Sequence, residues 1–417
     1  MIGPIAAAEA AHRILEEVRR QPALRMPLDD ALDAVLAEDQ VSPIDIPAWP
    51  NSAMDGYALH AADVRGASDR SPARLSVVDY LPAGRFPTRA VGTGEATRIF
   101  TGAPIPEGAD AVVRQEDTDQ GADTVAIVRP VEAGANIRQA GEDIRKGRTV
   151  LREGAELGPA QLGVLASLAV ASPLVYRQPR VAILGSGDEI ADLDQPEEIL
   201  SGRKIASSNT HTLLAAVRRA GAEPVNLGIA ADTPESLRLR LKRALDADLL
   251  VTTAGVSVGE HDHLRGVLDE LGAEQRFWKI RMRPGAPVAF GVLHGVPWIG
   301  LPGNPVSTMV TFELFVRPAI RKMAGHPLPF RRTVAVRTAE PIRLKAQLQH
   351  FLRAIVTEGA NGPEARLTGP QGSGILTSMM LANALLIIPE GQLDTPAGAT
   401  VRAILLDEPV HCSEPGF

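Results

Sequence analysis

The sequence predicts a multidomain protein of α/β and β domains, with a doubly wound α/β domain as its largest part. Between residues 179 and 325, short apolar runs alternate with segments that repeat apolar residues at helical spacing. This alternation is typical of a parallel sheet covered by helices. The regions on both sides carry shorter alternating runs punctuated by Gly and Pro, which indicates β domains. With 417 residues, the chain is long enough for several domains with their own cores.

Composition excludes several classes of protein. Apolar residues make up 45% of the chain and charged residues 22%, as in ordinary globular proteins. The net charge of −7 argues against nucleic-acid binding, so local Arg or Lys must hold any anionic substrate. Cys412 is the only cysteine, which excludes a disulfide framework or a cysteine metal cluster within one chain. No signal-peptide pattern is found, and the longest apolar run, Leu162–Val175, is too short to span a membrane, so we expect a cytoplasmic protein.

Helical spacing at both ends of a β-rich region predicts a split helical domain with an insertion. Apolar residues share one helical face within residues 8–18, 28–36 and 159–171. The intervening region contains short alternating runs such as Leu75–Val78. The predicted domains are an elongated helical domain (1–45 and 145–178), an inserted β-rich domain (46–144), the α/β domain (179–326) and a small C-terminal β-barrel (327–417).

Apolar runs and capping residues predict the order of elements in the α/β domain. Strands are expected at Val181–Leu184, Val225–Leu227, Leu249–Thr252, Val288–Phe290 and Pro297–Leu301. Residue types that commonly cap helices mark helix starts at Asn209, at Thr233 before Pro234, and at Asn304 before Pro305. The C-terminal barrel is predicted from alternating runs at 334–336, 351–356, 384–388 and 401–405.

The stretch Leu249–Asp262, LLVTTAGVSVGEHD, carries the clearest sign of a ligand site. Its apolar start predicts a strand, its glycines a loop, and the apolar spacing that follows a helix. In a parallel sheet such a loop lies at the carboxyl end of the strand, where ligands bind. Glycine there lets the backbone approach an anion, which the N–H groups of the helix start can hold.

Acidic side chains follow three of the predicted strands. Asp188 and Glu189 follow the first, Asp232 the second and Asp262 the third. Any one of these acids alone would more often be a helix cap or a turn residue. Because the ends of parallel strands converge at one edge, all four beside the helix start at Pro305 predict a site for Mg²⁺ and phosphate.

Three basic residues, Lys279, Arg281 and Arg283, lie before the predicted strand at Val288–Phe290, and Arg281 and Arg283 would share a face if they continued a strand. They could form a solvated edge, or they could clamp an oxyanion, since a guanidinium grips such oxygens with two hydrogen bonds. Histidines flank Asp262, but no third nitrogen or sulfur ligand is near in sequence, so zinc is not favoured.

Several motifs together resemble those of a known family. In order they are NSAMDGYA (51–58), TGAPIPEGADAVV (101–113), GEDI (141–144), GSGDE (185–189), GVSVGEHD (255–262), FWK (277–279) and GLPGNPVS (300–307). On these motifs the chain resembles the molybdopterin molybdenumtransferases, the family of MoeA and the gephyrin E domain. The resemblance covers essentially the whole chain, and the first and last motifs in one protein are highly specific.

The resemblance implies the final step of molybdenum cofactor synthesis. Adenylylated molybdopterin and molybdate would be the substrates, and Mg²⁺ the cofactor for hydrolysis of the adenylate. It also implies a homodimer of elongated four-domain subunits whose active site is shared between the subunits. Contact with the molybdopterin adenylyltransferase, which supplies the substrate, is expected as well.

The motifs assign roles to individual residues. The resemblance implies catalytic roles for Asp55, Thr101, Asp143, Glu189, Asp232 and Asp262, with Glu189 and Asp262 as the Mg²⁺ ligands. The residues expected to bind substrate are Arg138, Ser186, Gly187, Asp188, Gly255, Ser257, Gly259, Lys279, Arg281, Arg283, Pro302, Asn304, Pro305, Ser307, Arg353 and Ser378. Of these, Ser307, Arg353 and Ser378 are expected on the molybdate side.

Two departures from the family pattern keep other functions open. Ala286 stands where the family usually has a lysine expected to help hold molybdate, and Ala254 where it usually has glycine. Arg281 could compensate for the lost lysine. The alternatives are a non-catalytic pterin-binding or scaffolding paralogue, an insertase for tungstate, and adenylyl transfer to molybdopterin. The complete set of acids favours an enzyme, and the domains flanking the α/β part favour the insertase over the adenylyltransferase.

Overall fold

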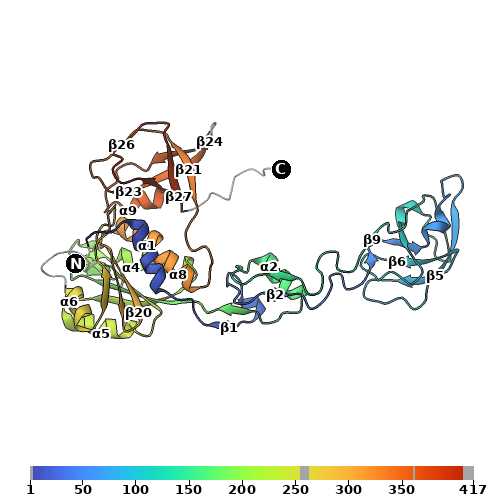
Figure 1. Cartoon of the computed structure of the whole chain (residues 1–417), viewed down its shortest axis with the longest axis horizontal. Coiled ribbons are helices and arrows are strands. Elements are labelled where there is room, and N and C mark those ends of the chain that lie inside the picture. Colours follow the sequence, from blue (N-terminus) through green and yellow to red (C-terminus); the bar gives the residue numbers. More distant parts are fainter. Residues whose placement is uncertain (1–2, 254–262, 360–361, 407–417) are drawn as a thin grey trace. The chain divides into compact units, whose positions relative to one another are not determined.

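The computed structural model describes residues 3–253, 263–359 and 362–406 (Figure 1). It confirms the predicted fold class, with a doubly wound α/β domain, a β-rich insertion and a closed C-terminal β-barrel. By internal contacts the chain divides into two compact units. The larger unit comprises Met1–Ala37, Gly154–Pro159 and Ser172–Phe417, and the insertion unit comprises Glu38–Glu153 and Ala160–Ala171.

The α/β sheet of the larger unit has the strand order β15-β12-β16-β20-β19-β17. Its strands are β12 (Arg180–Ser186), β15 (Glu223–Ala230), β16 (Leu249–Thr253), β17 (Glu274–Phe277), β19 (Ala289–Leu293) and β20 (Val296–Leu301). The first four strands in this order are parallel, whereas β19 runs antiparallel to both of its neighbours. The carboxyl ends of β12, β15, β16 and β20 therefore meet at one edge of the sheet, as the sequence predicts.

Helices cover both faces of this sheet because successive side chains of a strand point to opposite faces. The helices are α1 (Ala7–Glu17), α4 (Ser208–Arg219), α5 (Pro234–Ala244), α6 (His263–Glu270), α7 (Pro305–Thr311), the π-helical η4 (Phe312–Val316) and α8 (Arg317–Met323). Val181 and Ile183 pack in a core with α1, α4, α7, η4 and α8. Ala182 and Leu184 pack in a second core with α5 and α6. None of the helices that the structure describes has the length and hydrophobicity needed to span a bilayer.

Helix α1 forms as its apolar spacing predicts, but it belongs to the α/β core. Its Ala10 and Ile14 are fully buried in the same cluster as Ile320 of α8. Our prediction that it packs with the other helices of a separate helical domain is therefore wrong. The physical reason is that most side chains on the buried face of α1 are alanines. Because they are small, they let α1 approach α8 and η4 closely.

The prediction of a second helix within residues 28–36 is also wrong. Only the single 3₁₀ turn η1 (Leu28–Asp30) forms, Asp33 then adopts a φ of 63°, and Leu36 pairs with Val175 in a β-bridge. Two short strand pairs form within the region predicted to be helical: β1 (Ala23–Arg25) with β11 (Leu174–Tyr176), and β2 (Gln40–Val41) with β10 (Thr149–Leu151). The third predicted helix forms as α2 (Pro159–Ser167) but ends before the expected Ala171.

The insertion unit is rich in β structure, and its main sheet has the order β7-β4-β6-β5-β8. The strands are β3 (Asn51–Ser52), β4 (Gly56–Leu59), β5 (Ala73–Leu81), β6 (Glu95–Ile99), β7 (Ala111–Arg114), β8 (Thr124–Ile127) and β9 (Ile137–Arg138), with the short helices η2 (Ala61–Val64) and η3 (Gln115–Asp117). Gly56 is required where β4 pairs with β7, because a Cβ there would lie 1.8 Å from the Val113 carbonyl oxygen.

The C-terminal sheet closes into a barrel, with the order β18-β23-β24-β21-β27-β25 and a further pairing of β25 with β23. The elements are β18 (Met282–Arg283), β21 (Thr333–Thr338), β22 (Ile342–Arg343), β23 (Gln349–Gly359), β24 (Gly362–Leu367), α9 (Leu376–Leu381), β25 (Ala384–Ile388), β26 (Asp394–Thr395) and β27 (Thr400–Leu405). Arg281 and Arg283 do not continue β17, which ends at Phe277. Instead, β18 pairs with β23 of the barrel.

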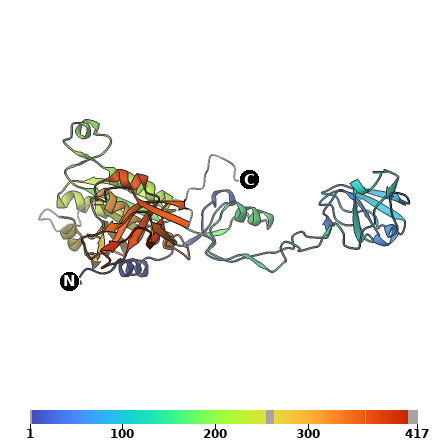
Figure 2. The same cartoon turned by 90° about the horizontal axis from the view of Figure 1, so that it is seen from above.

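One excursion leaves the α/β sheet after β12. It consists of β13 (Ile190–Ala191), α3 (Pro196–Leu200) and β14 (Ile205–Ala206), and β13 pairs with β14. Figure 2 shows the helix of this excursion standing clear of the sheet. Its two ends bring Ile190 and Ile205 back to the carboxyl edge.

Candidate functional site

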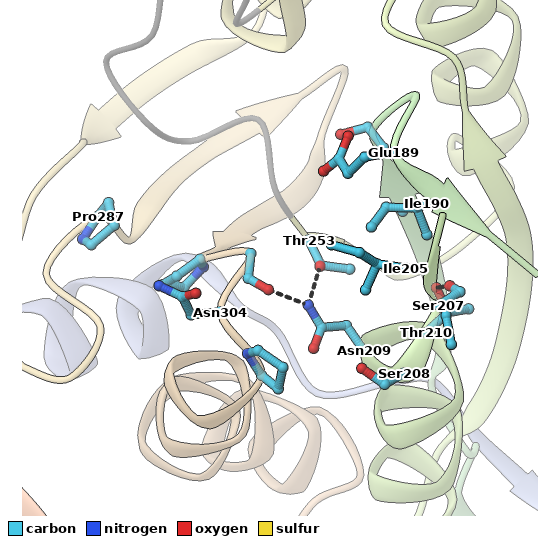
Figure 3. A pocket seen from close by; sticks show the side chains of 16 residues that line it. Glu189, Ile190, Ile205, Ser207, Ser208, Asn209, Thr210, Thr253, Pro287 and Asn304 are labelled. Carbon is cyan, nitrogen blue, oxygen red and sulfur yellow. Dashed lines mark hydrogen bonds between the residues drawn. The ribbon is translucent and has the colours of Figure 1, made fainter. Parts of the chain in front are cut away.

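A pocket of about 460 Å³ opens at the carboxyl edge of the parallel strands (Figure 3). Its wall consists of Gly185, Ser186, Glu189, Ile190, Ile205, Ala206, Ser207, Ser208, Asn209, Thr210, Thr253, Pro287, Pro302, Gly303, Asn304 and Pro305. We call this the main pocket. It contains residues from the ends of β12, β16 and β20, which is the position that the strand order predicts for a ligand.

The GSGDE motif shapes one side of the main pocket. Gly187 has a φ of 135°, and a Cβ at this position would lie 2.6 Å from the Glu189 carboxylate. Glycine is therefore required here both for the backbone conformation and for the space that the Glu189 side chain occupies. The Glu189 side chain is exposed and accepts no hydrogen bond from the described residues, so its oxygens are free to bind a cation.

Asn209 ties three elements together beneath the pocket. Its Nδ2 donates to the Gly303 carbonyl oxygen at 2.7 Å and to Thr253 Oγ1 at 3.1 Å (Figure 3). These bonds join α4 to the ends of β16 and β20. Our prediction that Asn209 caps a helix is wrong, because Ser207 occupies the N-cap position and Asn209 lies inside the first turn. Ser207 in turn donates to Thr210 Oγ1 at 2.8 Å.

Two helices begin at the main pocket. Helix α4 starts with Ser208 and α7 with Pro305, and both residues line the wall. The unpaired N–H groups and the positive dipole end of a helix favour an anion in front of it. Pro305 occupies the first helical position, as predicted, with Asn304 at the N-cap position but without a side-chain capping bond. The pocket thus combines anion-binding backbone with one free carboxylate.

Of the four acids predicted to cluster, the structure describes Asp188, Glu189 and Asp232. Glu189 lines the main pocket, but Asp188 and Asp232 bond to each other's backbone, with Asp232 N at 3.1 Å from Asp188 Oδ1. Asp262, together with Gly255, Ser257 and Gly259, lies outside the described residues. In the described part of the chain, no group of three or more His, Cys, Asp or Glu side chains could hold a metal ion.

A smaller pocket of about 280 Å³ adjoins the main one and shares Pro287 and Asn304 with it. Its other wall residues are Met282, Arg283, Pro284, Gly285, Ala286, Ser307, Leu348, Gln371 and Ser373. We call this the oxyanion pocket. The loop that carries Gln371 and Ser373 comes from the barrel domain, and Val306 N donates to the Ser373 carbonyl oxygen at 3.1 Å. Predicted residues Arg283 and Ser307 therefore lie here, beside Ala286, where the family resemblance leads us to expect a lysine.

Two other predicted basic residues do not line either pocket. The Arg281 guanidinium is bonded to Glu390, at 3.1 Å from Nε to Oε1, and to the Pro4 carbonyl oxygen at 2.7 Å. Arg281 therefore does not take the place of the lysine that the resemblance implies at 286. Lys279 is exposed, and its carbonyl oxygen accepts a hydrogen bond from Ile5 N.

Arg353 and Ser378 lie inside the barrel domain. Arg353 is completely buried, and burial lowers the pKa of its guanidinium. The guanidinium donates to Ser378 Oγ at 3.0 Å and to three carbonyl oxygens, those of Pro370, Gln371 and Gly372. Arg353 thus holds the loop that supplies part of the oxyanion pocket, and all its contacts are internal.

Asp55 and Thr101 come together in the insertion unit. Asp55 Oδ1 accepts hydrogen bonds from both Thr101 N and Thr101 Oγ1, each at 2.8 Å. These two bonds, aided by the charge of Arg98, hold the pKa of the Asp55 carboxyl below its ordinary value. No described residue donates to Asp55 Oδ2, which leaves this oxygen available to a ligand.

Arg138 and Asp143 belong to the same unit. Arg138 in β9 pairs with Asn51 of β3, whose neighbour Ser52 accepts a hydrogen bond from Gly102 N at 2.8 Å. The NSAMD segment therefore holds Arg138 on one side and the Thr101 loop on the other. Asp143 is exposed on the turn beyond, and its N–H donates to the Ile46 carbonyl oxygen at 3.0 Å.

Several residues that line the pockets were not predicted from the sequence. They are Ser207, Ser208, Asn209, Thr210 and Thr253 in the main pocket, and Gln371 and Ser373 in the oxyanion pocket. The run of small polar residues at the start of α4 was a signal that could have pointed to the first group. The second group gave no signal, because only the packing of the barrel loop against α7 brings it to the site.

Three models of protein families match the chain in order. They are "MoeA N-terminal region (domain I and II)" over residues 5–169, "Probable molybdopterin binding domain" over residues 182–322 and "MoeA C-terminal region (domain IV)" over residues 335–406. Together they span nearly all of the described chain.

Whole proteins are similar to this chain over almost their full length. Molybdopterin molybdenumtransferase 2 of Mycobacterium tuberculosis H37Rv is 39% identical over 396 residues, which cover 93% of this chain and 96% of that protein. The molybdopterin molybdenumtransferase of Staphylococcus aureus strain COL is 34% identical over 405 residues, 97% of this chain and 96% of its own. Among solved structures, the molybdopterin biosynthesis moeA protein of Pyrococcus horikoshii OT3 aligns with a TM-score of 0.81 at 31% identity, covering 96% of this chain and 100% of that one.

Proposed function

The chain belongs to the MoeA family of molybdopterin molybdenumtransferases, and we propose that it inserts molybdate into adenylylated molybdopterin with Mg²⁺-dependent release of AMP. The transferase activity in molybdenum cofactor biosynthesis follows from the family. The proposal adds the form of the pterin substrate, the cation and the leaving group.

The two adjoining pockets are the observation that carries this proposal. The main pocket, at about 460 Å³, lies in the size range of sites for drug-sized ligands such as a pterin nucleotide. Its two helix starts favour the phosphates. The oxyanion pocket, at about 280 Å³, offers Arg283 and the Ser307 hydroxyl to a tetrahedral oxyanion. Because the pockets share Pro287 and Asn304, a substrate in the first can present its reacting end to the second.

A magnesium ion suits the donor set at the main pocket. Mg²⁺ is commonly bound by one or two carboxylates together with substrate phosphates and water. Glu189 supplies one free carboxylate, and Asp262, outside the described residues, would supply the second. When bound, the ion would neutralise charge on the phosphates as the adenylate leaves. The protein's own part is to hold the phosphates at the helix starts and to keep Glu189 free of competing partners.

The insertion unit contributes a second set of groups to the proposed reaction. Asp55, Thr101, Arg138 and Asp143 all belong to it. We propose that the protein is a homodimer in which the insertion unit of each subunit completes the active site of the other, since Asp55 Oδ2 lacks a described donor within its own unit. The adenylyltransferase that makes the substrate is the proposed delivery partner.

A direct assay tests the function. The purified protein is incubated with adenylylated molybdopterin, Mg²⁺ and molybdate, and AMP release and cofactor formation are measured together. We expect both products in proportion, and neither without Mg²⁺. Replacing molybdate with tungstate in a parallel reaction separates a molybdate from a tungstate insertase. Binding of the pterin nucleotide without AMP release under all conditions would favour the non-catalytic paralogue and would overturn the proposal.

A further inference from the structure

Beside the Asp55–Thr101 pair lies a basic side chain that the motifs do not assign. Arg98 belongs to β6, and its guanidinium lies over the ring of Tyr57, 4.8 Å from the centroid, and over the ring of Phe100 at 5.2 Å. We propose that Arg98 is a positioning residue whose stacked guanidinium fixes Asp55 against Thr101 for the transferase reaction. This inference rests on the proposed role of Asp55 in that reaction.

The strand register explains why these side chains meet. Tyr57 of β4 and Arg98 of β6 are directly opposite each other in an antiparallel pair. Cross-strand partners point to the same face of a sheet, and so do residues two apart, such as Arg98 and Phe100. The guanidinium is therefore placed between the two rings by the sheet itself.

Each ring is a close chain neighbour of one member of the catalytic pair. Tyr57 follows Asp55 by two residues, and Phe100 directly precedes Thr101. Stacking Arg98 between the rings therefore couples the start of β4 to the end of β6, where Asp55 and Thr101 meet. Phe100 is itself held by an edge-to-face contact with Tyr80, at 5.1 Å between ring centroids.

A hydrogen-bonded bridge makes a second connection between Arg98 and Asp55. Arg98 Nη2 donates to Gln115 Oε1 at 2.7 Å, and Gln115 N donates to the Asp55 carbonyl oxygen at 2.9 Å. Arg98 thereby contacts the backbone of Asp55 through one residue. Removing the guanidinium would loosen both the ring stack and this bridge.

The charge of Arg98 is also directed to the pair. Among the described residues no carboxylate forms a salt bridge with Arg98, and its hydrogen bond goes to a neutral amide. After the two bonds from Thr101, the charge of Arg98 is a further cause of the lowered pKa of Asp55. The Arg98 side chain is half-buried, and its stacking and its bond to Gln115 direct it to the Asp55 segment.

The test compares Arg98→Met, Arg98→Lys and the control Arg114→Met in the full-length protein. Arg114 is an exposed arginine on β7, which pairs with β4, and it is bonded to Asp117. The Asp55 carboxyl is titrated by ¹³C NMR of aspartate-labelled protein, with its signal assigned by Asp55→Asn. The rate of AMP release is measured at saturating substrate and across the pH range, and the melting temperature of each variant is recorded.

Arg98→Met should raise the titration midpoint of Asp55 and lower kcat about 10-fold or more, with KM changed less than about 2-fold, because misplacement of a catalytic group costs rate. Arg98→Lys keeps the charge but loses the planar stack. Its Asp55 titration midpoint and its kcat should therefore lie between those of the wild type and of Arg98→Met. If Arg98→Met does not fold, Arg98→Lys alone decides on the same criteria. A midpoint and kcat equal to those of Arg114→Met, or a raised KM with unchanged kcat, would overturn the proposal. If the wild type releases no AMP, the proposed function fails, while the titration still decides whether Arg98 acts on Asp55.

Discussion

The guanidinium of Arg353 lies 3.0 Å from Ser378 Oγ, inside the barrel domain and fully shielded from solvent. From the family resemblance, we expect both residues on the molybdate side of the active site. Their geometry indicates how they would act there. Arg353 also bonds three successive carbonyls of the 370–372 loop, and Gln371 of that loop lines the oxyanion pocket. Arg353 and Ser378 would therefore shape the pocket through the loop, without contacting the oxyanion.

The first prediction concerns Arg353. Arg353→Met leaves three part-buried carbonyl bonds and Ser378 without their donor, which should destabilise the protein by on the order of 3 kcal/mol. Calorimetric melting measures this loss, and molybdate titration of AMP release should show a higher half-saturating concentration. Arg402→Met, which removes an exposed arginine of β27, is the control and should change neither quantity. Unchanged stability with a raised molybdate requirement would instead mean that Arg353 meets the oxyanion directly.

The second prediction concerns the titration of Asp55. Thr101→Val removes the hydroxyl donor, so the pKa of Asp55 should rise toward its ordinary value, whereas Thr88→Val, a surface control, should leave it unchanged. Because the folded-state pKa is depressed, ionised Asp55 stabilises the fold at pH above its ordinary pKa. That contribution is lost as the pH falls through the folded-state pKa, and in Thr101→Val the contribution should be smaller and its loss complete at a higher pH. Titration by ¹³C NMR checks the midpoint. If the titration midpoint of Asp55 is the same in Thr101→Val as in the wild type, the hydroxyl of Thr101 does not contribute, and the bond from Thr101 N accounts for the lowered pKa.

Local sequence signals predicted elements better than they predicted packing. The cap of Thr233 forms as expected, with its side chain accepting from Ser236 N at 3.3 Å, because capping depends on residues within one turn. The helix expected within residues 28–36 fails, since pairing of Leu36 with Val175 involves a partner far along the chain. Asn209 shows the same limit at the site. Asparagine commonly caps helices, but the side-chain amide of Asn209 instead donates hydrogen bonds to Thr253 and Gly303, which are distant in sequence.

The third prediction concerns charge at the main pocket. Glu189→Gln keeps the size of the side chain but removes the charge proposed to hold Mg²⁺. AMP release should fall by roughly 10²-fold or more if that charge places the cation where the transition state needs it. The fold should persist because Glu189 is an exposed loop residue. Glu197→Gln, an exposed acid at the start of α3, is the matched control. Normal turnover in Glu189→Gln at all Mg²⁺ concentrations would exclude Glu189 as a ligand.

The fourth prediction concerns Ala286, at the position where the family resemblance implies a lysine. Ala286 lines the oxyanion pocket with Arg283 and Ser307, and Arg281 is occupied by Glu390. Ala286→Lys should add one charge-assisted contact, about 1.5–3 kcal/mol, and so lower the molybdate concentration for half-maximal rate by roughly 10- to 150-fold. Ala286→Met adds similar bulk without charge and should not reproduce the gain. An unchanged or raised molybdate requirement in Ala286→Lys would show that the pocket already neutralises the dianion.

The fifth prediction concerns the proposed sharing of the active site between subunits. Asp55 belongs to the insertion unit and Glu189 to the larger unit. Homodimers of Asp55→Asn and of Glu189→Gln should each be nearly inactive. When the two variants are unfolded and refolded together in equal amounts, random pairing gives about half mixed dimers. If each insertion unit serves the partner's pockets, one of the two sites in a mixed dimer carries both lesions and the other is wholly wild type.

Activity should then return to roughly a quarter of the wild-type level, because half of the dimers hold one intact site out of two. Refolding each variant alone is the control for losses during refolding, and native mass spectrometry confirms that mixed dimers have formed. If each site were built within one chain, every site in the mixture would carry one lesion. Activity near zero in a sample with confirmed mixed dimers would therefore rule out the shared site, because no pairing of subunits could then restore an intact set of residues.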